Sequence, residues 1–371
     1  MSTIEWAFDR VVLPEVVRAD ARVTATDGQV TAVTGSQPAE GAAQRVEGTA
    51  MPGFVDLQVN GAGGRSVDEA TPEALDVVAE AVWSGGAVAF LPTLITAPWT
   101  ELLRQVRDVA AWCRAWSGQG AEPLGLHVEG PFLTAPGAHD PSCLVAPTPA
   151  RVDELLAAAD GQKLLVTLAN AADGAAAATR RLVEAGATVA LGHCERADGF
   201  EACVDAGATA VTHLFNVMGR MHHREPGLAT LALDEDRLTC PLIVDGVHVS
   251  PTMVRNAFRV LGPRRMALVT DAVGAAGMPD GRYTLAGMEV TAEGGVVRDG
   301  EGNLAGSALT MAQAAQRFLE FVPDVGPWTL ARLASANPAD LIGAERFGAV
   351  GVGRRAAFTV IAPDGSLRAV R

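Results

Sequence analysis

The chain has 371 residues, of which 49% are hydrophobic and 19% charged, and its formal net charge is −14. These values place it among soluble globular proteins with one large domain and a smaller one. The charge argues against nucleic acid or an anionic membrane as the main partner, although a local basic pocket could hold an anionic small substrate. We find no signal peptide and no run that could span a bilayer. Five scattered cysteines indicate reduced thiols in the cytoplasm.

Residues 1–50 predict a small β element, because short alternating segments such as ARVTATDGQVTAV are broken by turns and by the polar loop GSQPAEGAA. The pattern then changes to apolar runs separated by Ala- and Leu-rich helical stretches. These runs are typical of buried parallel strands and lie at 54–60, 87–92, 124–128, 164–168, 188–192, 209–213, 241–245 and 267–271. Eight strands alternating with helices predict a (β/α)₈ barrel, here over residues 51–344.

The last stretch, 345–371, returns to strand alternation. We expect it to join the N-terminal strands in one small β domain, with the barrel inserted between the two halves. A doubly wound sheet is the alternative fold. It is disfavoured because the segment GAGGRS after the first run lacks the G-x-G-x-x-G spacing of a dinucleotide site.

Four ionisable residues end apolar runs, in the segments LGLHVEG, TVALGH, ATAVTHLFN and MALVTD: Glu129, His193, His213 and Asp271. The carboxyl ends of barrel strands form one face, so these side chains should meet there. A single histidine is usually structural and a single aspartate often caps a helix. Two imidazoles and a carboxylate on one face instead suit a divalent metal and a water molecule, with the aspartate as a base. His127, by contrast, is expected to be a buried core histidine.

Ten segments extend this pattern in order from about residue 52 to the C-terminus: LPTLIT, GLHVEGPFL, GAH, LGH, VTHLFNVM, HREPGLA, IVDGVHV, LVTDA, GSALTM and SANPADLIG. Together they resemble the N-acetylglucosamine-6-phosphate deacetylases of the amidohydrolase superfamily. The resemblance implies a (β/α)₈ barrel with a small β-sandwich from both termini. It also implies hydrolysis of the substrate acetamide, which yields glucosamine 6-phosphate and acetate.

The resemblance further assigns roles to matching positions. It implies one divalent metal per subunit, Zn²⁺ first and Fe²⁺, Co²⁺ or Mn²⁺ as alternatives, held by Glu129, His193 and His213. Asp271 would be the general acid and base, and His139 would stabilise the oxyanion. The phosphorylated N-acetyl amino sugar would contact His139, Asn216, Val217, His248 and Arg224. Because Arg224 would come from a neighbouring subunit, a homodimer or higher homo-oligomer is expected.

Two departures from the superfamily pattern bear on the metal content. The first strand carries Gln58-x-Asn60 where many members have His-x-His, and Lys163 lies at the start of the fourth strand rather than at its end. The usual ligands of a second metal are therefore missing. We expect one metal, with Gln58, Asn60 and Met311 lining the pocket. The 134–146 loop, which holds Cys143, also departs from the family and leaves local details open.

Three alternatives remain at this stage. The substrate could be the galactosamine epimer. The chain could be another amidohydrolase, such as a dihydroorotase, hydantoinase or nucleobase deaminase, although HREPGL favours a phosphorylated substrate. It could also be a catalytically inactive sugar-phosphate sensor on the same fold, which retention of the expected ligands and of Asp271 disfavours.

Overall fold

The computed structural model describes residues 2–35 and 43–371, so most of the polar loop expected at 35–43 lies outside the described residues. Both ends of the chain contribute to one six-stranded sheet in the order β21-β20-β4-β1-β2-β3. Its strands are β1 (Thr3–Val12), β2 (Val17–Thr26), β3 (Gln29–Thr34), β4 (Gln44–Pro52), β20 (Phe358–Ile361) and β21 (Leu367–Val370). The antiparallel pairing of β20 with β4 joins the two halves, as the sequence predicted.

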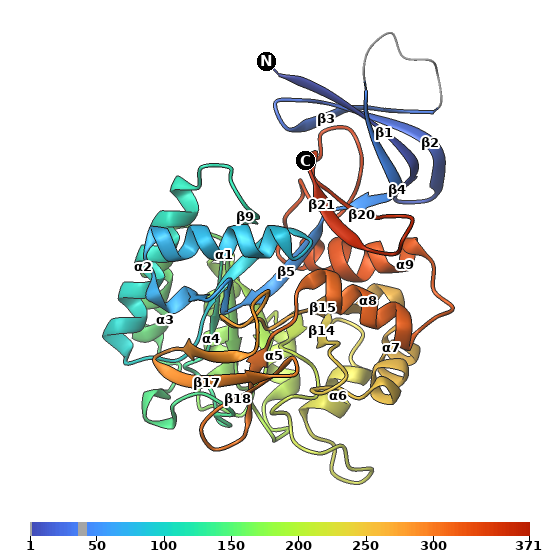
Figure 1. Ribbon diagram of the computed structural model, residues 1–371. Coiled ribbons are helices and arrows are strands. Elements are labelled where there is room, and N and C mark those ends of the chain that lie inside the picture. Colours follow the sequence, from blue (N-terminus) through green and yellow to red (C-terminus); the bar gives the residue numbers. More distant parts are fainter. Residues whose placement is uncertain (1, 36–42) are drawn as a thin grey trace.

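All eight predicted apolar runs form strands of a mixed α/β fold. They are β5 (Phe54–Val59), β8 (Ala87–Leu94), β10 (Leu126–Glu129), β11 (Leu164–Leu168), β12 (Thr188–Leu191), β13 (Ala210–Val211), β14 (Cys240–Ile243) and β15 (Met266–Val269). Strands β5, β8, β10, β11, β12 and β13 lie side by side in one parallel sheet, and β14 pairs with β15. Single parallel bridges, Ala210 with Thr239 and Val59 with Ala272, connect the two sheets. The strands therefore follow one another around a curled, barrel-like sheet (Figure 1).

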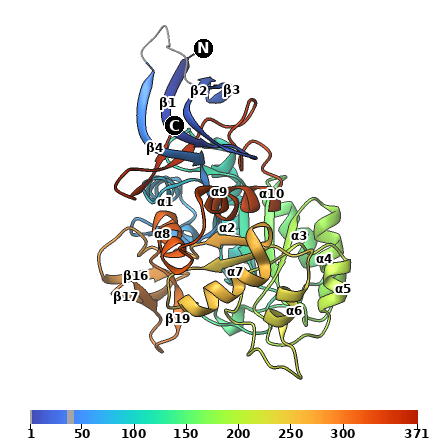
Figure 2. The same ribbon diagram turned by 90° about the vertical axis from the view of Figure 1, so that its right-hand side faces the viewer.

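Helices connect these strands and cover the outside of the curled sheet (Figures 1 and 2). They are α1 (Pro72–Ser84), α2 (Trp99–Ala115), α3 (Pro149–Ala159), α4 (Ala175–Glu184), α5 (Phe200–Asp205), α6 (Leu228–Asp234), α7 (Pro251–Arg265), α8 (Met311–Phe321), α9 (Pro327–Ala331), the π-helix η3 (Arg332–Ala336) and α10 (Asn337–Leu341). Thr71, Thr148 and Ser250 start α1, α3 and α7, because each hydroxyl accepts a bond from the N–H three residues later. No described helix has the length and hydrophobicity needed to cross a membrane.

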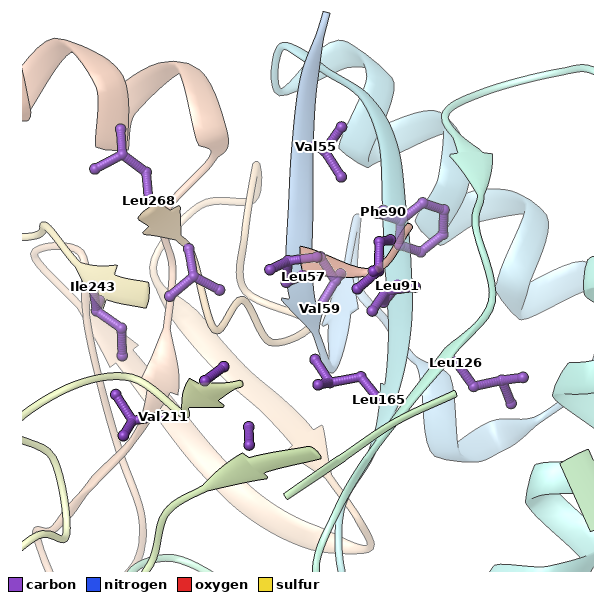
Figure 3. Close-up of a cluster of buried hydrophobic side chains, with 14 of the residues drawn as sticks. Val55, Leu57, Val59, Phe90, Leu91, Leu126, Leu165, Val211, Ile243 and Leu268 are labelled. Atoms are coloured by element: carbon purple, nitrogen blue, oxygen red, sulfur yellow. The ribbon is translucent and has the colours of Figure 1, made fainter. Parts of the chain in front are cut away.

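The main core lies between the strands and the helices and inside the curled sheet. Apolar side chains of all eight strands gather there, among them Val55, Leu57, Phe90, Leu165 and Leu268, each at most 5% exposed (Figure 3). Burying a Leu or Phe side chain contributes about 1.5–3 kcal/mol. This packing fixes the strand positions, and therefore fixes the positions of the polar residues that follow the strands.

The chain between β15 and α8 forms a further sheet, which is antiparallel. The sequence analysis did not predict this sheet. It comprises β16 (Gly281–Leu285), β17 (Met288–Glu293), β18 (Val296–Arg298) and β19 (Leu304–Ser307), and we call it the hairpin sheet. Leu285, Val290 and Val297 are buried in a small core that they share with Ile95 and Val273, which follow β8 and β15. The hairpin sheet lies at the end of the molecule opposite the terminal sheet (Figures 1 and 2).

Candidate active site and metal centre

A cavity of about 410 Å³ opens at the carboxyl ends of the barrel strands. Most of the predicted site residues line it: Asn60, Glu129, His139, His193, His213, Asn216, Val217, His248 and Asp271. The hairpin sheet supplies another wall through Arg298 and Asn303, which the sequence reading missed. A ligand pocket of a few hundred Å³ suits a small metabolite.

Glu129, His193 and His213 converge in this cavity. The Oε1 atom of Glu129 lies 3.1 Å from His193 Nε2 and 2.9 Å from His213 Nε2, and the two ring nitrogens are 3.1 Å apart. All three side chains are nearly inaccessible to solvent. Ligand atoms around a tetrahedral zinc are about 3.3 Å apart, which is close to these separations. Three potential acceptor atoms facing one another need a proton or a cation between them, so the donor set fits a divalent metal.

Hydrogen bonds at the far ring nitrogens orient two of the histidines. Nδ1 of His193 lies 3.0 Å from the carbonyl oxygen of Ala135, which can only accept, so Nε2 is left bare toward Glu129. Nδ1 of His139 faces the backbone N–H of Thr96 at 3.4 Å, which can only donate. His139 Nε2 then carries the ring proton and lies 3.6 Å from Glu129 Oε2. His139 is close enough to join the metal cluster, but this tautomer makes it a donor rather than a ligand.

Three of these side chains follow strands in an unusual backbone conformation. The φ angles of His193, His213 and Asp271 are +49°, +31° and +51°. Residues other than glycine seldom adopt this left-handed region, and each such residue costs on the order of 1–3 kcal/mol. At each of these residues the left-handed turn ends the extended segment and directs the residue's own side chain into the cavity. The packing around the site must therefore compensate for the energetic cost of this conformation.

Two side-chain amides hold Asp271, one from β5 and one from the residue that follows β5. Gln58 Nε2 and Asn60 Nδ2 donate to the same oxygen, Asp271 Oδ1, at 2.9 and 2.7 Å. Burial, followed by the negative charge of Glu129, raises the pKa of Asp271 above its ordinary value. A cation bound at Glu129 would act in the opposite direction. We call Gln58, Asn60 and Asp271 the amide clamp.

The sequence reading missed two supporting carboxylates. Asp56, on β5, accepts from the hydroxyl of Thr270 at 2.5 Å and from its N–H at 3.2 Å, and burial raises the pKa of Asp56 to about 7. Its alternation with Gln58 and Asn60 places all three on one strand face, so the signal was present. Asp245 lies 2.6 Å from Nδ1 of His248 and orients that ring in the cavity.

Other predicted residues lie elsewhere. Arg224 is exposed and is not among the residues that line the cavity of this single chain. Gln58 reaches the site only through Asp271. Met311 lines a separate cavity of about 20 Å³, so it does not shape the main pocket as expected. His127 bonds Thr167 at 2.8 Å, and burial lowers its pKa to about 4, as suits the core histidine that the sequence indicated.

Comparison with known proteins identifies the group to which this architecture belongs. Residues 49–370 match the amidohydrolase family. The chain belongs to the amidohydrolase family. Its membership confirms the superfamily that the ordered sequence segments resembled.

Within the amidohydrolase family, this chain is similar to amino sugar phosphate deacetylases. It is 37% identical to N-acetylgalactosamine-6-phosphate deacetylase of Escherichia coli O157:H7, over 85% of this chain and 84% of that one. It is 34% identical to N-acetylglucosamine-6-phosphate deacetylase of Vibrio furnissii, over 85% and 80%. The structure of a mutant N-acetyl-D-glucosamine-6-phosphate deacetylase of Mycobacterium smegmatis, in complex with N-acetyl-D-glucosamine-6-phosphate, is also similar. Its TM-score is 0.92 and its sequence identity is 34%, and the match covers 99% of this chain and 97% of that one. The predicted resemblance is therefore confirmed.

Proposed function

We propose that this protein hydrolyses the acetamide of N-acetylglucosamine 6-phosphate to glucosamine 6-phosphate and acetate in amino sugar metabolism. The observation that carries the proposal is the cluster of Glu129, His193 and His213 beside the amide clamp, in a cavity sized for a sugar phosphate. Deacetylases of this substrate are among the relatives and the similar structures.

Glu129, His193 and His213 would hold one divalent metal per subunit, with Zn²⁺ as our first choice and Fe²⁺, Co²⁺ or Mn²⁺ as alternatives. Such a metal supplies Lewis acidity and lowers the pKa of a water molecule to about 7. The chain has amides at Gln58 and Asn60, where a second metal would need stronger ligands. We therefore propose a single metal.

Asp271 moves the proton in this scheme. Its Oδ1 is occupied by the two amide donors, so Oδ2 is the atom that accepts a proton from the attacking water. The same oxygen then delivers the proton to the amine nitrogen as the C–N bond breaks. His139 donates from Nε2 to the carbonyl oxygen, whose negative charge grows as water adds.

The phosphate would lie at the side of the cavity formed by Asn216, Val217 and His248. Asp245 holds Nδ1 of His248 and so directs Nε2 toward the ligand. Since Arg224 of the same chain is exposed and outside the cavity, its proposed contact with the phosphate requires a neighbouring subunit. A homodimer or higher homo-oligomer is therefore part of the proposal.

The galactosamine epimer is a second candidate substrate, because the E. coli O157:H7 relative named for that epimer is 37% identical to this chain. The two sugars differ at one hydroxyl, and Arg298 and Asn303 of the hairpin sheet line the cavity where such a hydroxyl could be recognised.

We further propose that residues 1–50 and 345–371 constitute a small β-sandwich domain on a (β/α)₈ barrel of residues 51–344. A separate core supports this division, since Trp6, Val23, Phe358 and their neighbours pack apart from the barrel core. We also propose a cytoplasmic location, which agrees with the five free cysteines.

The test is acetate release by the purified protein, before chelation, after chelation and after return of zinc. N-acetylglucosamine 6-phosphate, its galactosamine epimer and unphosphorylated N-acetylglucosamine are compared. We expect zinc-restored release from a phosphorylated sugar and little from the unphosphorylated one. Absence of release from all three sugars, with one equivalent of metal bound, would overturn the proposal and leave a sensor or another amidohydrolase.

A further inference from the structure

A second cavity, about 440 Å³ in volume, lies between the terminal sheet and the barrel. Its walls come from the β1–β2 turn around Leu13, from Trp328 of α9, and from three arginines, Arg264, Arg332 and Arg354. We call this cavity the basic cleft. Figures 1 and 2 show α9 directly beside the terminal sheet, and the Trp328 indole donates to the carbonyl oxygen of Pro14 at 2.9 Å.

The basic cleft lies at the opposite end of the barrel strands from the active site. Pro52 and Arg264 line it and come two residues before β5 and β15, whereas Asn60 and Asp271 follow those strands. A strand of six residues, such as β5, spans about 20 Å. A ligand in the cleft would therefore bind at a site separate from the catalytic one.

The charges in the basic cleft are unbalanced. Asp340 is the only carboxylate among its lining residues, and its Oδ2 lies 3.7 Å from Arg332 Nη1. Arg264 is exposed, and its guanidinium group has no hydrogen bond or ion pair with any described residue. Three guanidinium groups and one carboxylate leave two positive charges in a chain whose net charge is −14. Such a local excess of positive charge attracts anions.

One donor in the basic cleft is buried and unpaired. Arg332 Nε has no hydrogen-bond partner among the described residues, although Nη2 of the same side chain donates to Asn337 at 2.5 Å. A buried N–H without a partner costs about 1–3 kcal/mol. The Arg332 side chain as a whole is 29% exposed, so an anion can reach it from the cleft.

The backbone around the cleft is firmly anchored. Arg332 begins the π-helix η3, and π-helical turns are often found at functional sites. Ser335 donates to Gly53 O at 2.7 Å, and Asn337 donates to Met266 O at 2.6 Å, so η3 and α10 are tied to the starts of β5 and β15. Arg332 thus projects from a framework that is formed before a ligand binds, which limits the ordering that binding requires at this residue.

We propose that the basic cleft binds a small phosphorylated metabolite with a ring. The guanidinium groups of Arg264, Arg332 and Arg354 would hold the phosphate, and the indole of Trp328 would pack against the ring. The volume is close to that of the catalytic cavity, so a sugar phosphate fits the available space. The proposal does not rest on deacetylase activity, because binding is measured without turnover.

Isothermal titration of the metal-loaded, full-length protein with glucose 6-phosphate tests this proposal. Arg264→Gln removes the arginine that has no partner, and Arg259→Gln on the same helix is the matched control, since Arg259 contacts only Asn256 of its own helix. We expect a binding event that weakens at least tenfold in Arg264→Gln and is unchanged in Arg259→Gln. His248→Asn, in the catalytic cavity, should leave that event intact.

Two results would overturn the proposal. One is identical titration of the wild type and Arg264→Gln; the other is loss of every binding event in His248→Asn. A titration with inorganic phosphate distinguishes the contribution of the phosphate group to affinity from the contribution of the ring. Glucose 6-phosphate should bind more tightly than inorganic phosphate, and equal affinity would exclude a role for the ring and for Trp328.

Discussion

The catalytic cavity and the basic cleft have similar volumes, about 410 and 440 Å³, but their charged groups differ. The catalytic cavity combines the carboxylates of Glu129 and Asp271 with histidines, and it suits a cation and proton transfer. The basic cleft has three guanidinium groups and one carboxylate, and it suits an anion. Cavity size alone therefore says little about function, whereas the residue types and their hydrogen bonds separate the two sites.

The backbone conformation also differs between the catalytic cavity and the basic cleft. His193, His213 and Asp271 adopt left-handed φ angles at the catalytic end. At the other end, the starts of β5 and β15 are tied down by ordinary hydrogen bonds from Ser335 and Asn337. Left-handed φ angles also occur away from the cavity, at Asp20, Asp27 and Asp160, but at the catalytic end they fall on residues whose side chains converge on one site. Four variants test this contrast, and they are ordered from the largest expected effect to the smallest.

Replacement of a proposed metal ligand should have the largest effect. His193→Asn should lose tightly bound metal and lower kcat/KM by more than roughly 10⁴-fold, because the carboxylate and the remaining imidazole cannot complete the site. Metal analysis of the purified variant and acetate release give the two readouts. His127→Asn is the control: it removes a buried histidine that lies two residues before Glu129 on β10, and it should retain one equivalent of metal.

Asp271→Asn should separate chemistry from metal binding. We expect kcat to fall by about 10²–10⁴-fold while one equivalent of metal remains, since an amide cannot accept the water proton. Metal content and single-turnover acetate release are measured on the same preparation. Activity within threefold of the wild type would rule out Asp271 as the general base.

Disruption of the amide clamp should have an intermediate effect. Asn60→Leu removes the 2.7 Å donor to Asp271 Oδ1, and we expect kcat to fall roughly 10- to 100-fold. Loss of a donor to the charged form raises the pKa of Asp271 further. Because the carboxylate is the active form, the acidic limb of the kcat profile should move to higher pH. Gln105→Met, a buried glutamine away from the site, should not move it.

Trp328→Phe should have the smallest effect. It removes the bond to Pro14 O between α9 and the terminal sheet, so we expect the free energy of unfolding to fall by about 1 kcal/mol with kcat/KM unchanged. Denaturant unfolding of the metal-loaded protein measures this. Trp116→Phe is a matched control, because its indole donates only to nearby Gln119 O. A tenfold loss of activity in Trp328→Phe would show that the two ends of the barrel are strongly coupled.

Much of the barrel was predictable because its strands are buried on both faces. The run containing Leu268 is wholly apolar and the run containing Val166 is interrupted only by Thr167, so the strands could be located to within a few residues. The pairing of β20 with β4 was likewise expected from alternation at both ends of the chain. The hairpin sheet was missed because its alternating residues, such as Tyr283 and Leu285, occupy short segments rich in glycine and charge.

The candidate site was predictable to the extent that its residues end strands. Glu129, His193, His213 and Asp271 do so, and they line one cavity. The amide clamp was not foreseen, because the contact of Gln58 with Asp271 depends on strand curvature over 213 residues of sequence separation. Alternation placed Asp56 on the same strand face as Gln58 and Asn60, but it did not identify Thr270 as the partner of Asp56 or His248 as the partner of Asp245.

The hairpin sheet also has a consequence for how such an enzyme could evolve. Its buried residues pack with Ile95 and Val273 in a small core distinct from the main one, and Arg298 and Asn303 reach the cavity that contains the proposed metal ligands. Asp299 holds the connecting turn by accepting from the N–H groups of Glu301 and Asn303. The proposed metal ligands and these two cavity-lining residues thus lie on separately packed parts of the chain, so substitutions in the turn need not displace the proposed catalytic groups.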